Sequence, residues 1–388
     1  MRVLHLIDAG GPQASPTTLA LLEASLGRLG DVDQRVLLLG GQRFIQQARA
    51  AGISNFAHVG VPMGHAVAGW MAVSAAVKRL GVFDLIHCWS LGTLNWSSIA
   101  LRSVPRFITL TVNPEPSVIR WLRVLTQHAQ SRTISLPISM AIHRTLLSSG
   151  LSAADAHVLL PALDFGKAVY SSRMATRASW GIDVDDDTVV VALLSDPPHR
   201  SDTHEAIMTL LLVADSQEAP RAMRLLVHPE QCNRCRGQSI MTDLGHGERN
   251  LTDERLAQPW EILPACDLAL AIGSGAGGLS LRWAMACNTP IVAEATYEIS
   301  EVVEDRHSAL LAPPRARYAL ANRLCQLMSD HQVSWQLRDT ARHEAFSFFS
   351  RQRYCQSLQR VYEQMVAGSE IEVPPMEPTG GLRFTGRA

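Results

Sequence analysis

The chain has 388 residues, of which 47% are hydrophobic and 18% are charged, and its formal net charge is −1. This length is enough for about two domains of ordinary size, and the hydrophobic content predicts a substantial core. The small net charge gives no global attraction to nucleic acid or to an anionic membrane, although a local basic patch is still compatible with it. We therefore expect no nucleic-acid partner and at most peripheral membrane contact.

The cysteines and the opening residues favour a cytoplasmic protein. Seven scattered cysteines, an odd number, suggest reduced thiols. Cys232 and Cys235 form one C-x-x-C, but no second ligand pair is visible, and His228 and His246 would complete a zinc site only by chance. No apolar run approaches the ~20 residues of a membrane span. The opening MRVLHLIDAGG leads directly into a strand and turn, unlike a signal peptide.

The first half of the chain alternates strand-like and helix-like runs. Strands are expected at 2–8, 34–41, 56–62, 83–90, 106–113, 132–139 and 156–164, and helices at 17–30, 45–53, 66–81, 94–104 and 140–150. Strands that alternate with helices favour a parallel, doubly wound sheet, and continuous apolar strands fit burial on both faces.

Residues 165–187 interrupt this pattern and are polar and charged, which predicts a linker with a short helix. The alternation restarts at Thr188. Strands are expected at 188–195, 223–229, 267–273 and 289–295, and helices at 203–216, 256–266, 317–330 and 333–368, with an irregular stretch at 231–250. The tail from residue 369 is rich in Pro and Gly and is predicted to be disordered.

A glycine cluster follows the strand predicted at 267–273. Gly273, Gly275 and Gly278 spell G-x-G-x-x-G, and Glu294 follows Gly273 by 21 positions, as in a dinucleotide-binding fingerprint. That fingerprint belongs to the first β–α unit of its fold, with several strands after it. Here the cluster comes late, and little strand signal follows Glu294. A nucleotide-dependent oxidoreductase is therefore the weakest of the hypotheses.

The physical character of the cluster does not depend on that fingerprint. A glycine-rich loop that leads into a helix offers free backbone N–H groups and the positive end of the helix dipole. Both favour an anion, most naturally a phosphate group. The alternative is a tight turn between strand and helix that holds no ligand.

Several segments together resemble GT-B glycosyltransferases, especially the large retaining group often called family 4. MRVLHLIDAGG resembles their first strand and glycine loop, and FDLIHCWS resembles their D-x-x-H-x-H strand with Trp89 in place of the second histidine. SMAIHRTLLSSG followed by VLLPALD resembles their serine–helix–glycine segment and the proline–asparagine–glycine–x–aspartate that follows it. The most specific segment, LRWAMACNTPIVAEATYEISEVVEDRHSALLAPP, resembles their L-E-A-M-A-C-G-x-P-V-V-A…E-V-V-x-D-G-x-x-G-L-L-V-P. The resemblance covers about residues 1–365.

The resemblance implies an α/β fold of the GT-B type, with two Rossmann-like, doubly wound parallel-sheet domains and an interdomain cleft. The expected parts are an acceptor-side domain at 1–165, a linker at 166–187, a donor-side domain at 188–350, a helix at 351–368 that returns to the first domain, and the tail at 369–388. It also implies transfer of a hexosyl group from a UDP- or GDP-sugar, with retention, to an unknown acceptor such as a glycan or lipid. No cofactor or metal is implied.

The site residues that the resemblance implies fall into three groups. The donor and phosphate group comprises Gly273, Gly275, Gly277, Gly278, Trp283, Arg200 and Glu301; the acceptor-side loop comprises Gly10 and Gly11; and Asn113, or Thr111 in another alignment, stands where a histidine lines the reaction centre. Glu301 matches an acid that meets the nucleoside ribose. His87 is expected to pack within its strand.

The departures from the family pattern lie at the donor site. Two glutamates of the family fall at Gly275 and Trp283, and Leu193 stands near its diphosphate-binding arginine. Only His199 or Arg200 lies near the lysine of that pair. Trp283 is compatible with stacking on a sugar or base, or with filling the donor pocket. These changes leave two main hypotheses, a divergent glycosyltransferase and a GT-B pseudoenzyme that binds a partner or glycan.

One further cation lies near the start of the helix after the glycine cluster. Arg282 is compatible with a contact to the donor phosphates, but we expect a solvated surface charge at this position.

Overall fold

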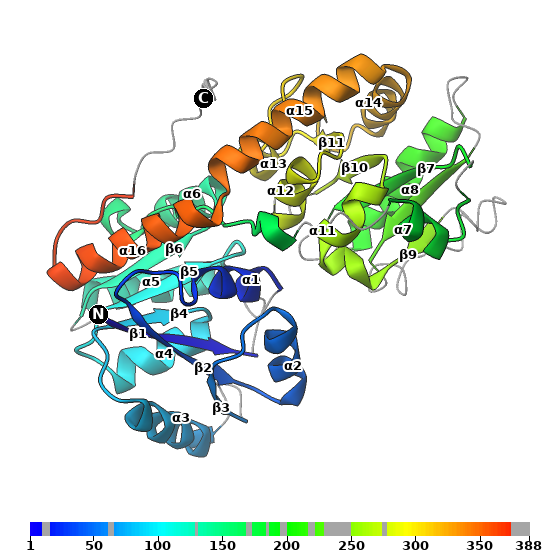
Figure 1. Ribbon diagram of the computed structural model, residues 1–388. Helices are drawn as coiled ribbons and strands as arrows, with labels where there is room; N and C mark the ends of the chain where they lie inside the picture. Colours follow the sequence, from blue (N-terminus) through cyan, green and yellow to red (C-terminus); the bar gives the residue numbers. More distant parts are fainter. Residues whose placement is uncertain are drawn as a thin grey trace. The chain divides into compact units, whose positions relative to one another are not determined.

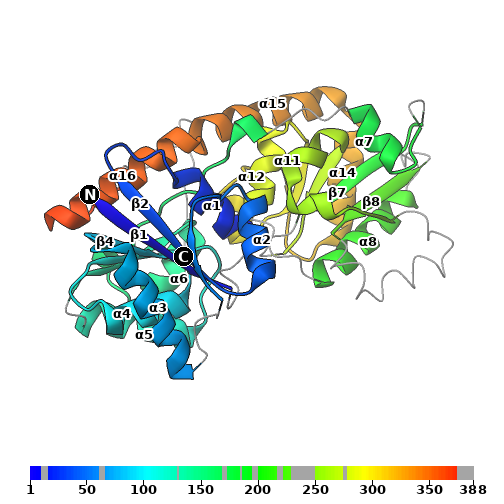
Figure 2. The ribbon, with the colours of Figure 1, turned by 60° about the horizontal axis from the view of Figure 1, so that its bottom comes forward.

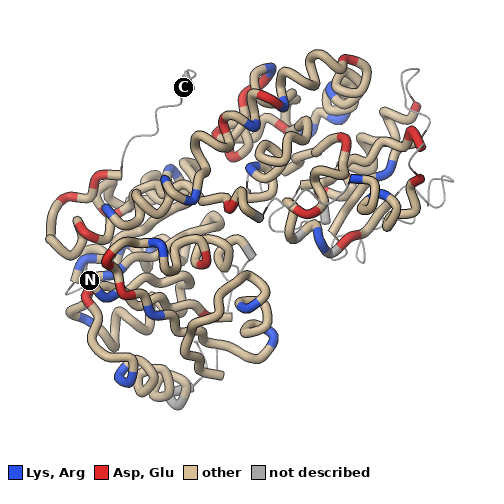
Figure 3. The backbone as a smooth tube through the Cα atoms, viewed as in Figure 1, with Lys and Arg blue, Asp and Glu red and all other residues tan. Residues whose placement is uncertain are grey.

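A computed structural model describes residues 1–9, 16–60, 66–128, 131–167, 173–183, 186–194, 200–215, 222–228, 250–273 and 278–373. The chain forms two compact units (Figures 1 and 2). The first holds Met1–Ala162 together with the segment that begins at Arg351, and the second holds Leu163–Ser350. Lysine and arginine residues are interspersed with aspartate and glutamate residues in both units (Figure 3).

The first unit is built on a six-stranded parallel sheet with the order β3-β2-β1-β4-β5-β6. Its strands are β1 (Arg2–Asp8), β2 (Asp33–Leu39), β3 (Ala57–Val59), β4 (Leu85–Cys88), β5 (Arg106–Leu110) and β6 (Thr133–Pro137). Its helices are α1 (Pro16–Ser25), α2 (Gln42–Ala50), α3 (Ala66–Leu80), α4 (Leu91–Ala100), α5 (Pro116–His128), α6 (Met140–Ser148) and α16 (Arg351–Ala367). Helices cover both faces, with α3 and α4 on one and α1 and α16 on the other (Figures 1 and 2).

Local signals in the sequence set the ends of these helices. Ser90 and Ser139 precede α4 and α6, and their hydroxyls accept hydrogen bonds from the backbone N–H groups of Thr93 and Ile142, both at 3.2 Å. These bonds satisfy donors that an uncapped helix start would leave without a partner. Gly150, just after α6, has φ +90°, a left-handed conformation that favours glycine.

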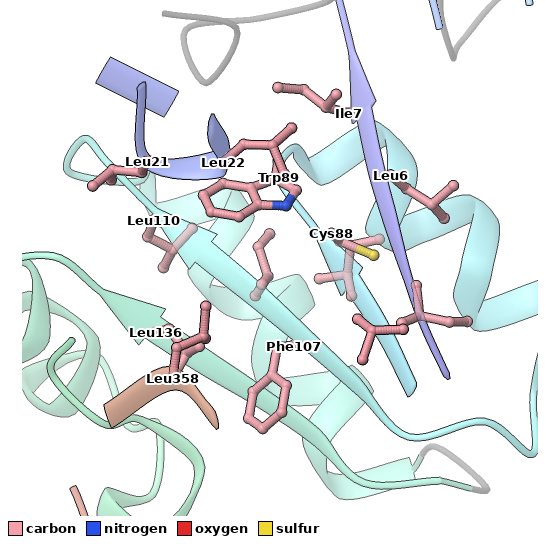
Figure 4. Packing of buried hydrophobic residues seen from close by; sticks show 14 of the residues in the cluster. Leu6, Ile7, Leu21, Leu22, Cys88, Trp89, Phe107, Leu110, Leu136 and Leu358 are labelled. Atoms are coloured by element: carbon pink, nitrogen blue, oxygen red, sulfur yellow. The ribbon is translucent and has the colours of Figure 1, made fainter. Parts of the chain in front are cut away.

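Helix α16 completes the core of the first unit although it follows the second unit in the chain. Tyr354, Leu358 and Tyr362 are all buried against that core. The Cys355 thiol donates to the Ala24 carbonyl at 3.3 Å, which ties α16 to α1. Leu358 lies among core side chains such as Leu136 and Phe107 (Figure 4).

A buried polar network lies inside this apolar core. His87 bonds the Tyr362 hydroxyl through Nδ1 and the Thr109 hydroxyl through Nε2, the latter at 2.7 Å. The Trp89 indole N–H donates to His5 Nδ1 at 3.1 Å and its ring stacks on His87, with 4.3 Å between centroids. His87 therefore packs within its strand, as expected. Trp89, in the place of a family histidine, is fully buried and serves the same network.

This network should make the first unit sensitive to acid. Burial lowers the pKa of His5 to about 3 and moves the pKa of His87 well below its usual 6.5. As the pH falls below about 6.5, these two histidines become protonated in the unfolded chain but stay neutral in the folded chain. The free energy of unfolding therefore falls. Each histidine contributes about 1.4 kcal/mol per pH unit in that window. Between pH 7.5 and 5.5 we expect a combined loss of about 2–3 kcal/mol.

Urea unfolding at a series of pH values measures this loss. His5→Gln should remove about half of the slope below pH 6.5, whereas His58→Gln, at an exposed position, should leave it unchanged. Equal slopes in the wild type and in His5→Gln would show that the histidines do not carry the effect.

The second unit repeats the same topology with the order β12-β11-β10-β7-β8-β9, again all parallel. Its strands are β7 (Val189–Leu194), β8 (Met223–Val227), β9 (Asn250–Thr252), β10 (Leu268–Ala271), β11 (Ile291–Glu294) and β12 (Leu310–Ala312). Its helices are α7 (Arg173–Ser179), α8 (Arg200–Ala214), α11 (Pro259–Ile262), α12 (Leu279–Ala286), α13 (Tyr297–Ser300), α14 (Arg317–Ser329) and α15 (His331–Phe348).

Several sequence-based expectations about elements are wrong. Residues 156–164 form no strand, because only Ala156 and Leu163 make isolated bridges there. Helix α5 and the short strands β9 and β12 were not expected. The run at 333–368, which the pattern alone shows as one helical stretch, is divided near Ser350 into α15 and α16, and α16 coincides with the helix expected at 351–368.

The segment predicted as a linker is attached to the second unit. Arg177, on α7, donates to a carboxylate oxygen of Asp267 at 3.0 Å, and Arg173 bonds the same carboxylate. Asp267 also accepts from the Val190 backbone N–H at 2.7 Å, so α7 is joined to the start of β7. Among the described residues no helix is both long and apolar enough to cross a membrane.

Candidate functional site

The sheet of the second unit has a topological switch point between β7 and β10. These strands are neighbours, and the chain continues from β7 toward β8 on one side and from β10 toward β11 on the other. In open parallel sheets ligands bind outside the carboxyl ends of the strands at such a point. Gly273, the first glycine of the cluster, follows the end of β10 by two residues and therefore lies at this switch point, whereas residues 274–277 lie outside the described residues.

The topology contradicts a dinucleotide fingerprint. Such a fingerprint follows the first strand of its sheet, whereas the cluster follows β10, the fourth strand of the unit in chain order. After Glu294 the described residues contain one short strand, β12, which pairs with β11, and otherwise helices, as expected. The fingerprint fails because of its position in the strand order, and not because the sheet ends.

Glu294 has a structural role that explains its spacing from Gly273. Because β10 and β11 are parallel neighbours, the carboxyl end of β11 lies beside the residues that follow β10. The Glu294 carboxylate accepts the Gly273 N–H at 3.0 Å and the Arg315 N–H at 2.8 Å. Gly273 and Arg315 have φ values of +77° and +62°. The buried carboxylate thus stabilises two left-handed turns.

Gly273 is also confined by an acid that the sequence analysis did not single out. A Cβ atom added to Gly273 would lie 2.7 Å from Oδ1 of Asp202, in the first turn of α8. Asp202 is buried. A carboxylate thus lies at the start of the loop that was predicted to hold a phosphate. An acid in the first turn of the helix after β7 was the signal available in the sequence.

Replacing Gly273 with alanine should destabilise the second unit by about 1–3 kcal/mol, because a left-handed L-residue costs 1–2 kcal/mol and the new methyl group meets Asp202. Gly278→Ala is the matched control, since Gly278 has φ −76°. Urea unfolding compares the two variants. Equal midpoints would show that the turn relaxes without strain.

Trp283 is buried in an aromatic cluster of the second unit. Its side chain is 3% exposed, and its ring centroid lies 5.1 Å from that of Trp260 and 6.5 Å from that of Phe165. Phe165 in turn stacks on Phe346 at 4.1 Å. The indole at one of the two glutamate positions of the family is therefore part of the packing between α11, α12 and α15.

The expectation that Arg282 is a solvated surface charge is wrong. Arg282 is 1% exposed, and its Nη1 donates to the Gly278 carbonyl at 3.0 Å. Its guanidinium lies over the Phe349 ring, 5.0 Å from the centroid, and its Nη2 lies 4.0 Å from Oε1 of Glu301. The side chain of Glu301, which was predicted to meet a ribose, is thus itself only 5% exposed and lies beside an arginine.

Of the other predicted site residues, three lie in the described ranges and the rest do not. Asn113 is exposed in the segment after β5, and the Thr111 hydroxyl lies 3.2 Å from that of Thr18. Arg200 is the first residue of α8. Outside the described residues lie Gly10, Gly11, Gly275, Gly277, His199, the Cys232/Cys235 pair and tail residues 374–388. No group of three metal-ligating side chains occurs within the described ranges.

Residues 207–330 match the family model described as "Glycosyl transferases group 1". No curated protein matches the sequence. Several solved structures are similar. HepE from Anabaena, in complex with UDP and glucose, is 18% identical with a TM-score of 0.76 and covers 92% of this chain and 98% of its own. A second Anabaena HepE structure contains UDP-glucose, with the same identity and TM-score, and covers 95% of this chain and 100% of its own.

Two further matches extend this likeness. A glycosyltransferase from Rickettsia africae is 12% identical with a TM-score of 0.73, covering 95% of this chain and 99% of its own. Sucrose-phosphate synthase from Thermosynechococcus elongatus is 14% identical with a TM-score of 0.68, covering 95% and 100%. At these identities the likeness establishes the fold. The chain has the two-domain α/β fold of GT-B glycosyltransferases, with two Rossmann-like parallel sheets.

Proposed function

We propose that the protein is a divergent glycosyltransferase that moves a sugar from a nucleotide-sugar donor to an acceptor. The observation that carries this proposal is the position of the glycine cluster. It begins at the switch point of the second sheet and lies inside the residues that match the group 1 family. That a UDP-sugar binds the similarly folded HepE supports UDP-glucose as the first donor to test.

In this proposal backbone N–H groups make most of the contacts to the donor. N–H groups at the start of α12 and in residues 274–278 would bind the diphosphate, since the Gly273 N–H is already bonded to Glu294, and Arg200 would supply a cation. Charge develops on the diphosphate as the glycosidic bond breaks, so these donors act on the leaving group. Hexosyl transfer with retention, a glycan or lipid acceptor, action without a cofactor, and a cytoplasmic location belong to the same proposal.

A second candidate, a GT-B pseudoenzyme, is favoured by three features of the same region. Asp202 puts a carboxylate at the first glycine of the loop, and Trp283 is buried where the family has a glutamate. The Glu301 side chain is 5% exposed and its Oε1 lies 4.0 Å from Arg282 Nη2. Each feature weakens a contact that a nucleotide sugar would use. Such a protein would bind a partner or a glycan and transfer nothing.

Two measurements separate these candidates. The first is titration calorimetry with UDP, GDP, ADP and NAD, and the second is nucleotide release from UDP-, GDP- and ADP-sugars. We expect UDP or GDP to bind, and Arg200→Gln to weaken binding about 10–150-fold through the loss of one charge-assisted hydrogen bond. Arg306→Gln, at a 73% exposed side chain, is the control. Binding of no nucleotide, or binding without release, supports the pseudoenzyme. Binding of NAD alone, or of no nucleotide, contradicts the transferase.

A further inference from the structure

The formal charge of −1 conceals a large difference between the two units. Residues 1–162 contain 13 lysine and arginine residues and 7 aspartate and glutamate residues, which gives a net charge of +6. Residues 163–350 contain 17 basic and 25 acidic residues, which gives a net charge of −8. Such an asymmetry within one chain is typical of a basic part that meets an anionic surface, such as nucleic acid or a membrane.

The helices α3, α4 and α5 lie on one face of the first sheet. The crossovers from β3 to β4, from β4 to β5 and from β5 to β6 all step in the same direction across the sheet. Such crossovers are almost always right-handed, which puts their helices on the same side. Figure 2 shows the three helices together there. None of the three contains an aspartate or glutamate, whereas α1 and α16, on the opposite face, contain Glu23 and Glu363.

The outward side chains of these helices are mostly basic or aliphatic. On α5, Arg120, Val124 and Gln127 are exposed at helical spacing, with Arg123 exposed beside them. The same kinds of residue are exposed on or just after α3 and α4. We call the exposed bases and large aliphatic residues of the three helices the basic face; its members are Met71, Lys78, Arg79, Val82, Ile99, Arg102, Arg120, Arg123 and Val124.

The five bases of the basic face are not neutralised by acids. Among the described residues no ion pair involves any of them. The sequence between α3 and α4 contains one acid, Asp84, whose carboxylate accepts the Arg2 backbone N–H at 2.8 Å. The positive charge of this face is therefore available to an anionic surface that approaches it.

Helix stability explains only part of this pattern. Lys78 and Arg79 lie in the last turn of α3, where a cation complements the helix dipole. Arg120 and Arg123 lie in the middle of α5, where the dipole gives no such reason. The dipole also does not explain the aliphatic members of the basic face, which are four of the six large hydrophobic residues that are exposed among the described residues of the first unit.

We propose that the basic face docks the first unit on an anionic phospholipid surface. Its bases would meet the lipid phosphates, and its aliphatic side chains would enter the headgroup region between them. Nucleic acid would use the positive charge alone, because aliphatic side chains gain nothing beside a phosphate backbone. Each base held near an anionic membrane strengthens binding about five-fold.

This docking goes beyond the proposed sugar transfer and does not rest on it. The basic face consists of helices that flank the first sheet, whereas the acceptor-side loop expected at Gly10 and Gly11 follows the carboxyl end of β1. Failure to bind vesicles would leave the donor site as it is, and an inactive donor site would leave vesicle binding unchanged. The two proposals are therefore tested separately.

The test is co-sedimentation of the full chain with vesicles of phosphatidylcholine, alone or mixed with phosphatidylglycerol. We expect binding to the mixed vesicles to be stronger by about ten-fold or more, and to fall as sodium chloride screens the charges. Arg120→Gln with Arg123→Gln should weaken that binding about 25-fold, which is about five-fold for each charge. Ile99→Ser with Val124→Ser keeps the charge and should weaken binding roughly ten-fold, because aliphatic contacts to the headgroup region are lost.

Arg43→Gln with Arg49→Gln is the matched control, because it removes the same charge from exposed positions of α2. Helix α2 lies on the opposite face, since the crossover from β2 to β3 steps in the other direction. Its binding should stay within about three-fold of the wild type. The proposal fails if neutral vesicles bind equally well, if the Arg120/Arg123 variant binds like the wild type, or if the control loses as much. Binding to a DNA duplex but not to vesicles would also overturn it.

Discussion

Replacing Trp283 with glutamate should unfold the second unit instead of restoring a donor site. The family pattern alone suggests that acids at Gly275 and Trp283 would regain two contacts to the donor sugar. The structure, however, buries Trp283 against Trp260 and Phe165. Loss of a buried tryptophan costs about 3–5 kcal/mol, and a buried carboxylate adds to that. We expect a loss of more than about 4 kcal/mol in urea unfolding.

Two variants make this result interpretable. Trp283→Phe keeps an aromatic ring and should lose much less stability, and Trp335→Glu changes a side chain that is 56% exposed. A stable Trp283→Glu protein with raised nucleotide release would show that the indole blocks an otherwise intact donor pocket.

The absence of the two family glutamates should also lower the activity toward nucleotide-sugar donors. Each charge-assisted hydrogen bond to the donor is worth roughly 1.5–3 kcal/mol, so without both acids we expect donor recognition to be weaker by about two to four powers of ten. Gly275→Glu alone tests one of them without disturbing the tryptophan. The measurement is nucleotide release from a panel of UDP-, GDP- and ADP-sugars, wild type against variant. Fast wild-type turnover would show that this chain has its own donor chemistry.

Arg282→Met should destabilise the second unit by about 3–5 kcal/mol. The substitution removes the cation from a buried pair and leaves the Glu301 carboxylate without it in a dry environment. It also removes the donor to the Gly278 carbonyl and the stack on Phe349. Urea unfolding at pH 7 measures the loss.

A double variant separates the pair from the packing around it. Arg282→Met with Glu301→Leu should recover much of the loss, because apolar residues often replace a buried ion pair at little cost. Arg306→Met, at an exposed side chain, should have almost no effect. A loss below 1 kcal/mol for Arg282→Met would mean that Glu301 turns to solvent, and would reopen its proposed role toward a ribose.

Most of the fold could be predicted because long apolar runs alternate with helical ones. Seven-residue strands such as β1 and β2, and capped helices such as α6, carry strong local signals. The three-residue strands β9 and β12 carry almost none, because they form only by pairing with β8 and β11. Residues 156–164 have strand-like composition but follow the edge strand β6 without extending the sheet.

The site was harder to predict than the fold because it depends on contacts between distant segments. Sequence spacing related Glu294 to Gly273 but could not show that the carboxylate bonds the Gly273 N–H. Arg282 looked like a surface charge because its partners, Glu301 and Phe349, follow it by 19 and 67 positions. Nothing in the sequence indicated a partner for Asp202. This residue lies near Gly273 because β7, which precedes α8, and β10, which precedes Gly273, are neighbouring strands of the sheet.

The split composition of the first unit has a consequence for how the protein is made. Within the described residues the second unit is one continuous stretch, 163–350. The first unit, in contrast, lacks α16 until the ribosome has synthesised the whole of that stretch and α16 itself. Domains generally fold as units during synthesis, N-terminal ones first. Here the earlier unit must wait for the later one, with the surface that Tyr354, Leu358 and Tyr362 will cover still open to water. We expect nascent chains that end near Ser350 to hold a folded second unit and an incomplete first unit that binds chaperones.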